Sequence, residues 1–597
     1  MSNPILMTDF YKLCHMMQFR DEITGFVSYL VPRGNRTKTF KGWTIFGIQK
    51  FCKDLKREFN TNFFTRPWGD IVEEVDHVLS KGLGYNQELI VATLRKIKKL
   101  YDVGYLPITI KALPEGTEVP IGCPAVEIIA TNDDCPWVGQ AIESWLSCAL
   151  WHPSMSATVG KAYAKICKAA YDKTVDKGDY HKACCDFSLR GQESYESAVA
   201  SAAGWLTAMH NSSTVEARDY IESNYLDISE LSIGGLTSTE HSVMTSDFAI
   251  TGDERETYRR LLTEVYPEVS FAAVCDSYDF WNILTNILPS LREEIEAHEG
   301  FFGVRHDSSD PVVALCGYPT IEITNFELEY LEEYELTDII LKELSESGIL
   351  EGEGEDSKTY RIKFYDLKTN ELLFDKIVVI EPEYANERGR YSDKKYWFVD
   401  NYTISEIRDT TFSDMGMVET MYELFGGTTN SKGYKVMNPK LKAVYGDSIT
   451  LQRAEKIFER LAEKGFAANN VSLGVGSFSM ECIEENGELK PFTRDTFSIA
   501  IKATAVRITD EEGNDKWIPV YKDPKGFSQK KSIKGFAVVL RDEEGNLTYK
   551  DELSKEEYAE FLRQKLDQKS VYFSYGVCSH NRFESVRERV DEEVKNI

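Results

Sequence analysis

The sequence predicts an α/β protein that combines a parallel barrel of strands and helices with a mixed α/β sandwich domain. Three observations lead to this fold class. From about residue 180 onward, brief apolar segments alternate with longer amphipathic segments, as in repeated strand–helix units of a parallel sheet. Seven or so such units indicate a barrel. The N-terminal part and the C-terminal part instead mix strands, helices and polar turns, and we expect them to form the sandwich domain together.

The individual elements follow from the spacing of apolar residues. In the N-terminal part, residues 27–33 and 105–116 are predicted as strands and residues 88–101 as a helix. The strands predicted from residue 180 onward are 183–187, 230–235, 270–275, 301–305, 441–446, 470–476 and 497–503. Helical patterns separate most of these strands, for example residues 195–210 and 449–465.

One gap between predicted strands is far longer than the others and indicates an insertion. It contains an acidic stretch at residues 343–356 and then an alternating segment at residues 359–383, which is predicted as a β-hairpin. Residues 318–403 are therefore predicted to be an inserted α+β segment with a structure of its own. The domain boundaries that we expect are 1–178 for the first part of the sandwich, 179–497 for the barrel and 498–597 for the part that completes the sandwich.

Composition narrows the possible classes of protein. The chain has 597 residues and a formal net charge of −28, which argues against nucleic-acid binding because that depends on neutralising phosphates. Its 12 cysteines include no CxxC pair, so we expect reduced thiols in the cytoplasm rather than disulfides or a zinc site. Neither a signal peptide nor an apolar run of membrane-spanning length is evident, so no membrane association is expected.

Charged residues, a histidine, a serine and glycines follow most of the predicted barrel strands at the point where each strand ends. They are Arg190, His241, Asp276, Arg305, Asp307, Gly446, Asp447, Gly474, Gly476 and Ser477. In α/β barrels the active site is built from the loops at the C-terminal ends of the strands. Each residue also has an ordinary explanation, such as an ion pair of Arg190 with Glu193 or a helix cap at Asp276. All of these explanations would have to hold at once, so we expect a site.

The residue types indicate what this site binds. Arg190 and Arg305 each present a fork of donors that suits phosphate oxygens. Glycines such as Gly446 allow backbone N–H groups to approach an anion closely. The acids would repel a lone phosphate, and they imply ribose hydroxyls or Mg²⁺ as partners. The sequence therefore predicts a site for a phosphorylated sugar with a metal ion.

Several ordered segments carry a resemblance to a known family. They are TDFYK (8–12), YLPITIKALPEG (105–116), DFSLRG (186–191), STEHS (238–242), DSYD (276–279), RHDSSDP (305–311), NSKGYK (430–435), YGD (445–447), TRD (493–495) and KDP (522–524). Through them the chain resembles the nicotinamide phosphoribosyltransferase family over nearly its whole length except the insertion. The resemblance implies a homodimer with shared active sites, each in an irregular barrel of the type II phosphoribosyltransferase kind.

The resemblance also implies the reaction and its residues. The substrates would be nicotinamide and 5-phosphoribosyl 1-pyrophosphate, with Mg²⁺ as cofactor and ATP as a co-substrate that phosphorylates His241. Phe187 and Tyr11 of the partner subunit would enclose the pyridine ring, with Asp9 nearby. Arg190, His241 and Arg305 would hold pyrophosphate, and Asp276 belongs to the same catalytic group. The residues implied for the ribose and its 5′-phosphate are Asp307, Gly446, Asp447, Gly476, Ser477 and Arg494, and those that reach phosphate groups are Arg33, Lys502 and Lys522.

Three positions depart from the family pattern. Ser213 stands where nicotinamide-selective members carry an Asp that accepts from the amide group, and a serine can donate to a carboxylate as in related nicotinate enzymes. The local residue thus favours nicotinic acid, whereas the whole-chain resemblance favours nicotinamide, which is our expectation. Ser477 replaces a glycine and His306 a proline. A further alternative is a non-catalytic protein that binds pyridine nucleotides, although such a protein would not need His241.

Overall fold

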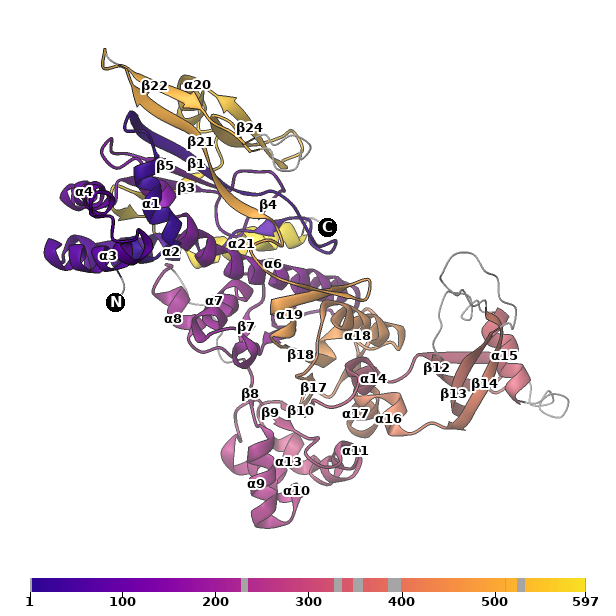
Figure 1. The fold of residues 1–597 in the computed structure, drawn as a ribbon. Coiled ribbons are helices and arrows are strands. Elements are labelled where there is room, and N and C mark those ends of the chain that lie inside the picture. The colour runs from indigo at the N-terminus through magenta and orange to yellow at the C-terminus, as the bar shows by residue number, and fades with distance from the viewer. Residues whose placement is uncertain are drawn as a thin grey trace. The chain divides into compact units, whose positions relative to one another are not determined.

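The computed structural model describes residues 3–226, 235–326, 336–346, 358–384, 399–510, 512–522 and 532–595. The chain divides into two compact units. Unit 1 comprises Met1–Lys165, Cys184–Gly235 and Val475–Ile597, and unit 2 comprises Ile166–Ala183 and Leu236–Gly474. Both units mix helices with sheets (Figure 1), as the predicted α/β fold class requires.

Unit 1 is organised around an antiparallel sheet of seven strands that come from both ends of the chain. In spatial order the strands are β22 (Asp515–Pro519), β21 (Ile499–Thr509), β1 (Ile23–Pro32), β5 (Val126–Ala130), β3 (Ile108–Ala112), β25 (Ser570–Ser574) and β26 (Val577–Cys578). Tyr29 of β1 lies opposite Lys502 of β21, so the N- and C-terminal parts share one sheet, as predicted.

The segment 497–503, which the apolar pattern placed among the barrel strands, belongs instead to β21 of this antiparallel sheet. An apolar run records that a strand is buried but not which strands lie beside it, so the sequence could not make this distinction. The predicted strand at residues 105–116 is shorter in the structure, where β3 ends at Ala112, just before the Leu113–Pro114 pair. The predicted helix at residues 88–101 is α4 (Gln87–Val103), which begins after Asn86, whose side chain accepts from the Leu89 amide.

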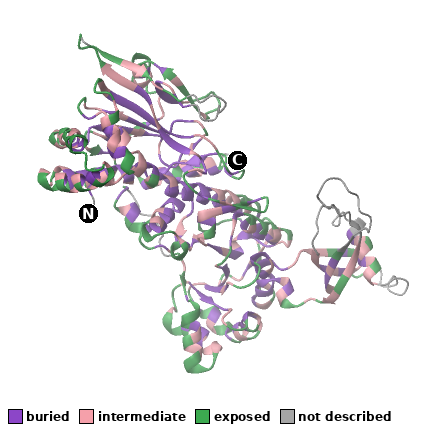
Figure 2. Ribbon diagram, viewed as in Figure 1, coloured by how far each residue is buried: buried purple, intermediate pink, exposed green. Residues whose placement is uncertain are grey.

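The core of the seven-stranded sheet also holds buried polar groups in place. Val27, Tyr29, Phe536 and Tyr558 pack together between β1, the hairpin β23 (Phe536–Arg541) and β24 (Leu547–Leu553), and helix α20 (Lys555–Arg563). Figure 2 shows the buried colour along β1 and its neighbours. The Tyr29 hydroxyl donates to Glu127 at 2.9 Å and accepts from the Ala537 amide at 2.9 Å. Pairing of this kind removes the cost of burying the hydroxyl.

The remaining helices of unit 1 are mostly amphipathic, and α6 is much the longest of them. They are α1 (Phe10–Gln18), α2 (Ile48–Phe59), α3 (Trp68–Gly82), α5 (Val138–Ala141), α6 (Glu143–Thr174), α7 (Tyr195–Trp205), α8 (Ala217–Glu222), α19 (Phe478–Glu481) and α21 (Phe583–Lys595). The predicted helix at residues 195–210 is α7, which ends at Trp205. Unit 1 also contains the short parallel pair β6 (Cys184–Asp186) and β7 (Asn211–Ser212).

Unit 2 contains the parallel strands that the alternating pattern predicts. In spatial order they are β8 (Thr237–Ser238), β9 (Phe271–Val274), β10 (Phe302–His306), β17 (Leu441–Tyr445) and β18 (Val471–Val475). Phe302 lies opposite Phe271 on one side and Leu441 on the other. The helices between them include α9 (His241–Thr251), α10 (Glu254–Arg260), α14 (Pro311–Cys316), α17 (Met417–Phe425) and α18 (Leu451–Glu463). The strand predicted at residues 230–235 lies, except for residue 235, outside the described residues.

The segment between β10 and β17 carries a small sheet with its own core. The sheet order is β11 (Thr320–Phe326), β12 (Lys358–Asp366), β13 (Leu372–Tyr384) and β14 (Val399–Asp409), with helix α15 (Leu336–Glu346) packed on it (Figure 1). The predicted hairpin at residues 359–383 is confirmed as β12 and β13. Arg361 on the sheet pairs with Asp375 and with Glu419 of α17, and Lys464 pairs with Glu419 as well. This buried network joins the inserted sheet to the rest of unit 2.

None of the helices in the described ranges combines the length and the apolar composition that crossing a bilayer demands.

Glu115 makes the folding stability of unit 1 depend on pH. Its carboxylate is fully buried, and one oxygen accepts from the Gly47 amide at 2.7 Å and from the Tyr225 hydroxyl at 3.0 Å. Burial raises the pKa of Glu115 to about 7 from 4.5. Between these two values the folded protein binds more protons than the unfolded chain, so stability falls as the pH rises from about 4.5 to about 7.

We predict that Glu115→Gln flattens this part of the pH–stability curve. The native protein is expected to lose up to about 3 kcal/mol of unfolding free energy between pH 5 and pH 8, and the variant much less. Urea denaturation at a series of pH values measures the slope. A variant whose stability falls as steeply as that of the native protein would contradict the role of Glu115.

Candidate active site

The polar residues predicted at the strand ends of unit 2 lie close together in the structure. His241, Asp276, Asp307 and Gly446 follow β8, β9, β10 and β17, and these strands are parallel neighbours. Their carboxyl ends therefore meet at one edge of the sheet. Arg305, near the end of β10, joins the group, since its guanidinium reaches the Ser238 hydroxyl at 3.3 Å.

Arg305 and Asp307 form a two-pronged ion pair at this edge. Nε of Arg305 donates to Oδ1 of Asp307 at 2.9 Å, and a second guanidinium nitrogen contacts the other carboxylate oxygen. The Gly446 amide donates to Oδ1 of Asp307 at 3.1 Å. A Cβ at position 446 would lie 2.8 Å from that oxygen and 2.9 Å from Nε of Arg305, so only glycine fits here without displacing the pair.

The Asp276 carboxylate holds the segment that carries Asp307 in place. One carboxylate oxygen accepts from the Asp307 amide at 3.0 Å and from the Ser308 hydroxyl at 2.6 Å. Burial raises the pKa of Asp276, but these hydrogen bonds outweigh it and leave the pKa below its ordinary value. The carboxylate is therefore ionised at neutral pH. Its other oxygen is buried and has no hydrogen-bond partner in the described part of the chain.

His241 is placed between this carboxylate and solvent. It is the first residue of α9, and 54% of its side chain is exposed. Nε2 lies 3.9 Å from the unpaired oxygen of Asp276, and Nδ1 lies 3.3 Å from the Ser277 hydroxyl. An accessible imidazole backed by a carboxylate can act as a base or a nucleophile, because the carboxylate stabilises the positive charge that develops on the ring.

Asp447 and His306 occupy different surroundings at this edge. Asp447 is exposed and accepts from the Ser448 hydroxyl at 2.7 Å, so its carboxylate is accessible to a ligand. His306 is buried, with its ring 4.0 Å from that of Phe280 and 5.8 Å from that of Tyr445. Burial lowers the pKa of His306, which keeps the ring neutral. His306 thus packs behind the edge that carries Asp307.

Unit 1 carries a second group of predicted residues, at the ends of β6 and β7. Phe187 follows β6, and its amide donates to the Val475 carbonyl at 2.8 Å. Arg190 lies in an exposed helical turn at Leu189–Gly191. A Cβ at Gly191 would lie only 2.0 Å from the Ser477 hydroxyl, so the turn that carries Arg190 and the Gly476–Ser477 loop lie against each other.

Ser213 has a definite hydrogen-bond partner. Its hydroxyl lies 2.8 Å from the backbone carbonyl of Asp186, and its amide donates to the same carbonyl at 2.9 Å. A carbonyl oxygen can only accept, so the Ser213 proton lies between the two oxygens. The hydroxyl therefore presents lone pairs, not a donor, to a ligand. The Asp186 carboxylate is itself buried and accepts from the Ser212 hydroxyl at 2.7 Å.

Charged residues of both signs line a cavity of about 320 Å³ in unit 1. They are Arg33, Lys502, Asp551 and Glu552, and this volume suits a small polar ligand. Burial and then the charge of Arg494 lower the pKa of Arg33, while burial and the charges of Arg33 and Lys522 lower that of Lys502. Among the described residues, Nε of Arg33 and the Thr504 hydroxyl are buried without a hydrogen-bond partner.

Glu485 fixes the loop that follows Arg33, and nothing in the sequence indicated this role. Its carboxylate accepts from the Lys38 amide at 2.7 Å and the Thr39 amide at 2.8 Å, and it pairs with Lys490. Burial opposes ionisation, but these contacts outweigh it and lower the pKa of Glu485 to about 2. Sequence analysis also missed Ser277, although it follows Asp276 directly within a quoted motif.

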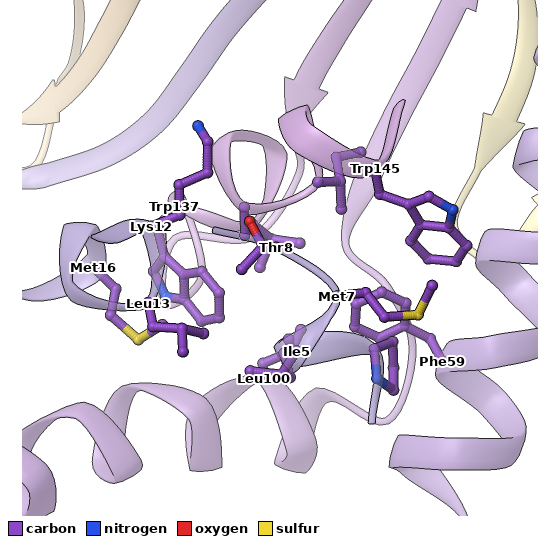
Figure 3. A pocket seen from close by; sticks show the side chains of 14 residues that line it. Ile5, Met7, Thr8, Lys12, Leu13, Met16, Phe59, Leu100, Trp137 and Trp145 are labelled. Carbon is purple, nitrogen blue, oxygen red and sulfur yellow. The ribbon is translucent and has the colours of Figure 1, made fainter. Parts of the chain in front are cut away.

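Asp9 is the residue directly before α1, and Tyr11 lies in the first turn of this helix of unit 1. Lys12, Leu13 and Met16 of α1 face an apolar group that includes Trp137 and Trp145 (Figure 3), around a cavity of only about 10 Å³, room for one water molecule. Lys12 also pairs with Glu143 at 2.6 Å. This packing fixes one side of α1, whereas Tyr11 remains 58% exposed.

The acidic residues fit Mg²⁺ only in partnership with a ligand. Within the described ranges no three or more His, Cys, Asp or Glu side chains converge on a point that would hold a metal ion. Mg²⁺ in phosphoryl-group enzymes is commonly held by one or two carboxylates together with substrate phosphates. The accessible carboxylate of Asp447 suits this arrangement, in which it would hold the ion together with substrate phosphates.

The fold and these residues define a class: an α/β protein whose parallel strand ends carry arginines, acids and glycines suited to phosphate esters. A sequence profile of the nicotinate phosphoribosyltransferase (NAPRTase) family matches residues 182–339 and 400–569. The chain belongs to this family and is a phosphoribosyltransferase. The gap between the two matched ranges falls within the inserted sheet.

Curated relatives align with all or most of this chain. The nicotinamide phosphoribosyltransferase of Acinetobacter baylyi is 27% identical over 614 residues, which cover 100% of this chain and 98% of the relative. That of Mycoplasma pneumoniae is 25% identical over 546 residues, or 89% and 94% of the two chains. Among solved structures, human nicotinic acid phosphoribosyltransferase is 12% identical with a TM-score of 0.46, over 98% of this chain and 93% of the other.

We predict that Gly446→Ala weakens the binding of pyrophosphate by about tenfold, because the added Cβ displaces the Arg305–Asp307 pair. Isothermal titration calorimetry with pyrophosphate measures the change. Gly69→Ala is the matched control, since a Cβ at Gly69 in α3 would meet nothing within 4 Å. Equal affinities of the two variants would show that the pair does not shape the anion site.

Proposed function

We propose that this protein transfers the phosphoribosyl group of 5-phosphoribosyl 1-pyrophosphate to nicotinamide, giving nicotinamide mononucleotide and pyrophosphate in NAD salvage. The observation that carries the proposal is the convergence of Arg305, Asp307 and Asp276 with His241 at the parallel strand ends of unit 2. The relatives named nicotinamide phosphoribosyltransferase, which align along the whole chain, support the same substrate.

In this reaction the pyridine nitrogen attacks C1 of the ribose while the bond from C1 to the pyrophosphate oxygen breaks. Pyrophosphate leaves with the electron pair of that bond, and positive charge develops on the ribose. Arg190 and Arg305 stabilise the leaving group, an electrostatic effect that is usually large because the donors are already in place. Mg²⁺, when bound, neutralises further charge on the pyrophosphate. None of these steps requires a nucleophilic side chain.

The remaining predicted residues hold the substrates in position. Phe187 and Tyr11 of the partner subunit enclose the pyridine ring in a homodimer, with Asp9 nearby. The exposure of Tyr11 on a firmly anchored helix supports this role. Asp307, Asp447 and Gly446 hold the ribose and its phosphate, together with Gly476 and Ser477. Arg33, Arg494, Lys502 and Lys522 hold phosphate groups, and the position of Arg33 and Lys502 in the lining of one cavity supports this role.

His241 is proposed to accept the γ-phosphate of ATP. The ring nitrogen attacks phosphorus, the bond to the ADP oxygen breaks, and hydrolysis of the phosphohistidine drives transfer toward product. The exposure of His241 leaves the ring accessible to ATP. The ionised carboxylate of Asp276, 3.9 Å from Nε2, stabilises the charge on the ring during this step.

The hydrogen bonding of Ser213 supports nicotinamide over nicotinate. Because the Ser213 proton is directed to the Asp186 carbonyl, the hydroxyl oxygen can accept from the amide group of nicotinamide. A nicotinate carboxylate would face the same lone pairs and be repelled. This reverses the preference that the residue type alone suggested. Nicotinate remains the second candidate, because a serine hydroxyl can rotate if a carboxylate offers a better partner.

We predict that the protein releases pyrophosphate from 5-phosphoribosyl 1-pyrophosphate faster with nicotinamide than with nicotinate. Ser213→Ala should raise the KM for nicotinamide about tenfold, the effect of losing one acceptor, and should lower that for nicotinate, because it removes the lone pairs that repel a carboxylate. Steady-state assays with both substrates decide this. Faster turnover of nicotinate would overturn the assignment of nicotinamide, and no turnover of either would overturn the proposed reaction.

We predict that His241→Ala abolishes the stimulation by ATP. Transfer without ATP should continue at a reduced rate, because the histidine acts on ATP and not on the ribose. Assays with and without ATP, and detection of acid-labile phosphate on the protein, measure both effects. Ser246→Ala, an exposed change on the same helix, is the control. Undiminished stimulation in His241→Ala would exclude the phosphohistidine.

A further inference from the structure

His152, Ser197 and Glu481 form a chain of polar contacts in unit 1 that the proposed reaction does not use. Nδ1 of His152 lies 2.8 Å from the Ser197 hydroxyl, and Nε2 lies 3.5 Å from Oε1 of Glu481. The histidine side chain is only 7% exposed. Its Nε2 and the facing Glu481 oxygen are buried, and neither makes a hydrogen bond within the described ranges, so their 3.5 Å approach is a polar contact and not a hydrogen bond.

Only a proton on Nε2 makes this contact favourable. A lone pair on Nε2 would face the lone pairs of the carboxylate, whereas an N–H group there turns its positive end toward Glu481. Nδ1 of the neutral ring is then an acceptor for the Ser197 hydroxyl. The neutral tautomer with its hydrogen on Nε2 therefore serves both neighbours, and no second proton is needed.

The three residues come from three helices, two of which lead to loops of the proposed site. Glu481 is the last residue of α19, a short helix that begins directly after Ser477. Ser197 lies in the first turn of α7, which follows the turn that carries Arg190. The two loops touch each other where Gly191 meets Ser477. His152, on the long helix α6, is thus in polar contact with the supports of both, through a hydrogen bond to Ser197 and a 3.5 Å approach to Glu481.

We propose that His152 is a positioning residue that fixes the Arg190 turn and the Gly476–Ser477 loop relative to each other, and so sets the affinity for the phosphate groups of the substrate. That these loops hold phosphate groups rests on the proposed function. The bridge itself rests on the contacts of His152 alone. A protein that lost it would keep its fold but hold the two loops less firmly.

A packing role is the alternative explanation for a buried histidine. The ring of His152 stacks on Trp151 with the centroids 5.0 Å apart. His152→Phe keeps a flat ring of similar size for this contact and removes both nitrogens. His152→Gln keeps a donor that can reach Glu481. If the ring only packs, the phenylalanine variant should behave like the native protein and the glutamine variant should be worse.

The experiment compares His152→Phe, His152→Gln, Ser197→Ala and Glu481→Gln with Ser156→Ala as matched control. Ser156 lies one turn further along α6, and its hydroxyl is 2.9 Å from that of Ser201 on α7, so this variant also removes a buried contact between the same helices. Steady-state kinetics give KM for 5-phosphoribosyl 1-pyrophosphate and kcat, and hydrogen–deuterium exchange reports on residues 189–192 and 475–481 without any substrate.

We expect His152→Phe to raise this KM about tenfold and to change kcat less than threefold, as loss of ground-state positioning requires. Glu481→Gln and Ser197→Ala should do the same to a smaller extent, and His152→Gln should recover part of the affinity. Exchange should increase in both loops of His152→Phe, but not in Ser156→Ala. Unchanged KM and unchanged exchange in His152→Phe would overturn the inference.

Failure of the proposed function would give a different result. If the native protein transferred no phosphoribosyl group to either pyridine, the kinetic comparison would end there, but the exchange comparison would still test the bridge. Increased exchange in the two loops would then support the bridge, and its absence would refute it. A shift of KM for nicotinamide alone would also refute the inference, because the bridge is assigned to the phosphate loops.

Discussion

The ion pair between Arg305 and Asp307 is the interaction on which the strand-end site of unit 2 depends. An arginine and a carboxylate can be held at the edge of a buried sheet only if each satisfies the other's hydrogen bonds, since a lone buried charge is costly. The parallel register of β9, β10 and β17 provides this, because it brings Asp276 and the Gly446 amide to the same pair. The requirement for glycine at position 446 follows from the pair.

Unit 1 carries a cavity lined by charges of both signs. Although the chain has a net charge of −28, Arg33 and Lys502 line this cavity together with Asp551 and Glu552. Burial lowers the pKa of both cations, and the charge of Arg33 lowers that of Lys502 as well. Glu485 restrains the loop that follows Arg33 through the Lys38 and Thr39 amides, and it pairs with Lys490.

The inserted sheet shows how a family fold accepts additional structure. It has an apolar core of its own, including Ile340, Ile362 and Phe364, and therefore needs little from its neighbours to fold. It contacts the rest of unit 2 through the buried network of Arg361, Glu419 and Lys464. Such a network specifies one arrangement, because moving any member leaves a buried charge without its partner.

The sequence by itself determined the α/β class, the parallel strands of unit 2, the hairpin of the insertion and the residues at the strand ends, because periodicity and residue type are local properties. It placed residues 497–503 with the wrong sheet, since an apolar run does not record its neighbours. The tertiary structure alone showed that His306 is buried between Phe280 and Tyr445, that the Ser213 proton is directed to Asp186, and that His152 joins Ser197 to Glu481. Each of these depends on residues distant in the chain, and only folding decides which atoms meet.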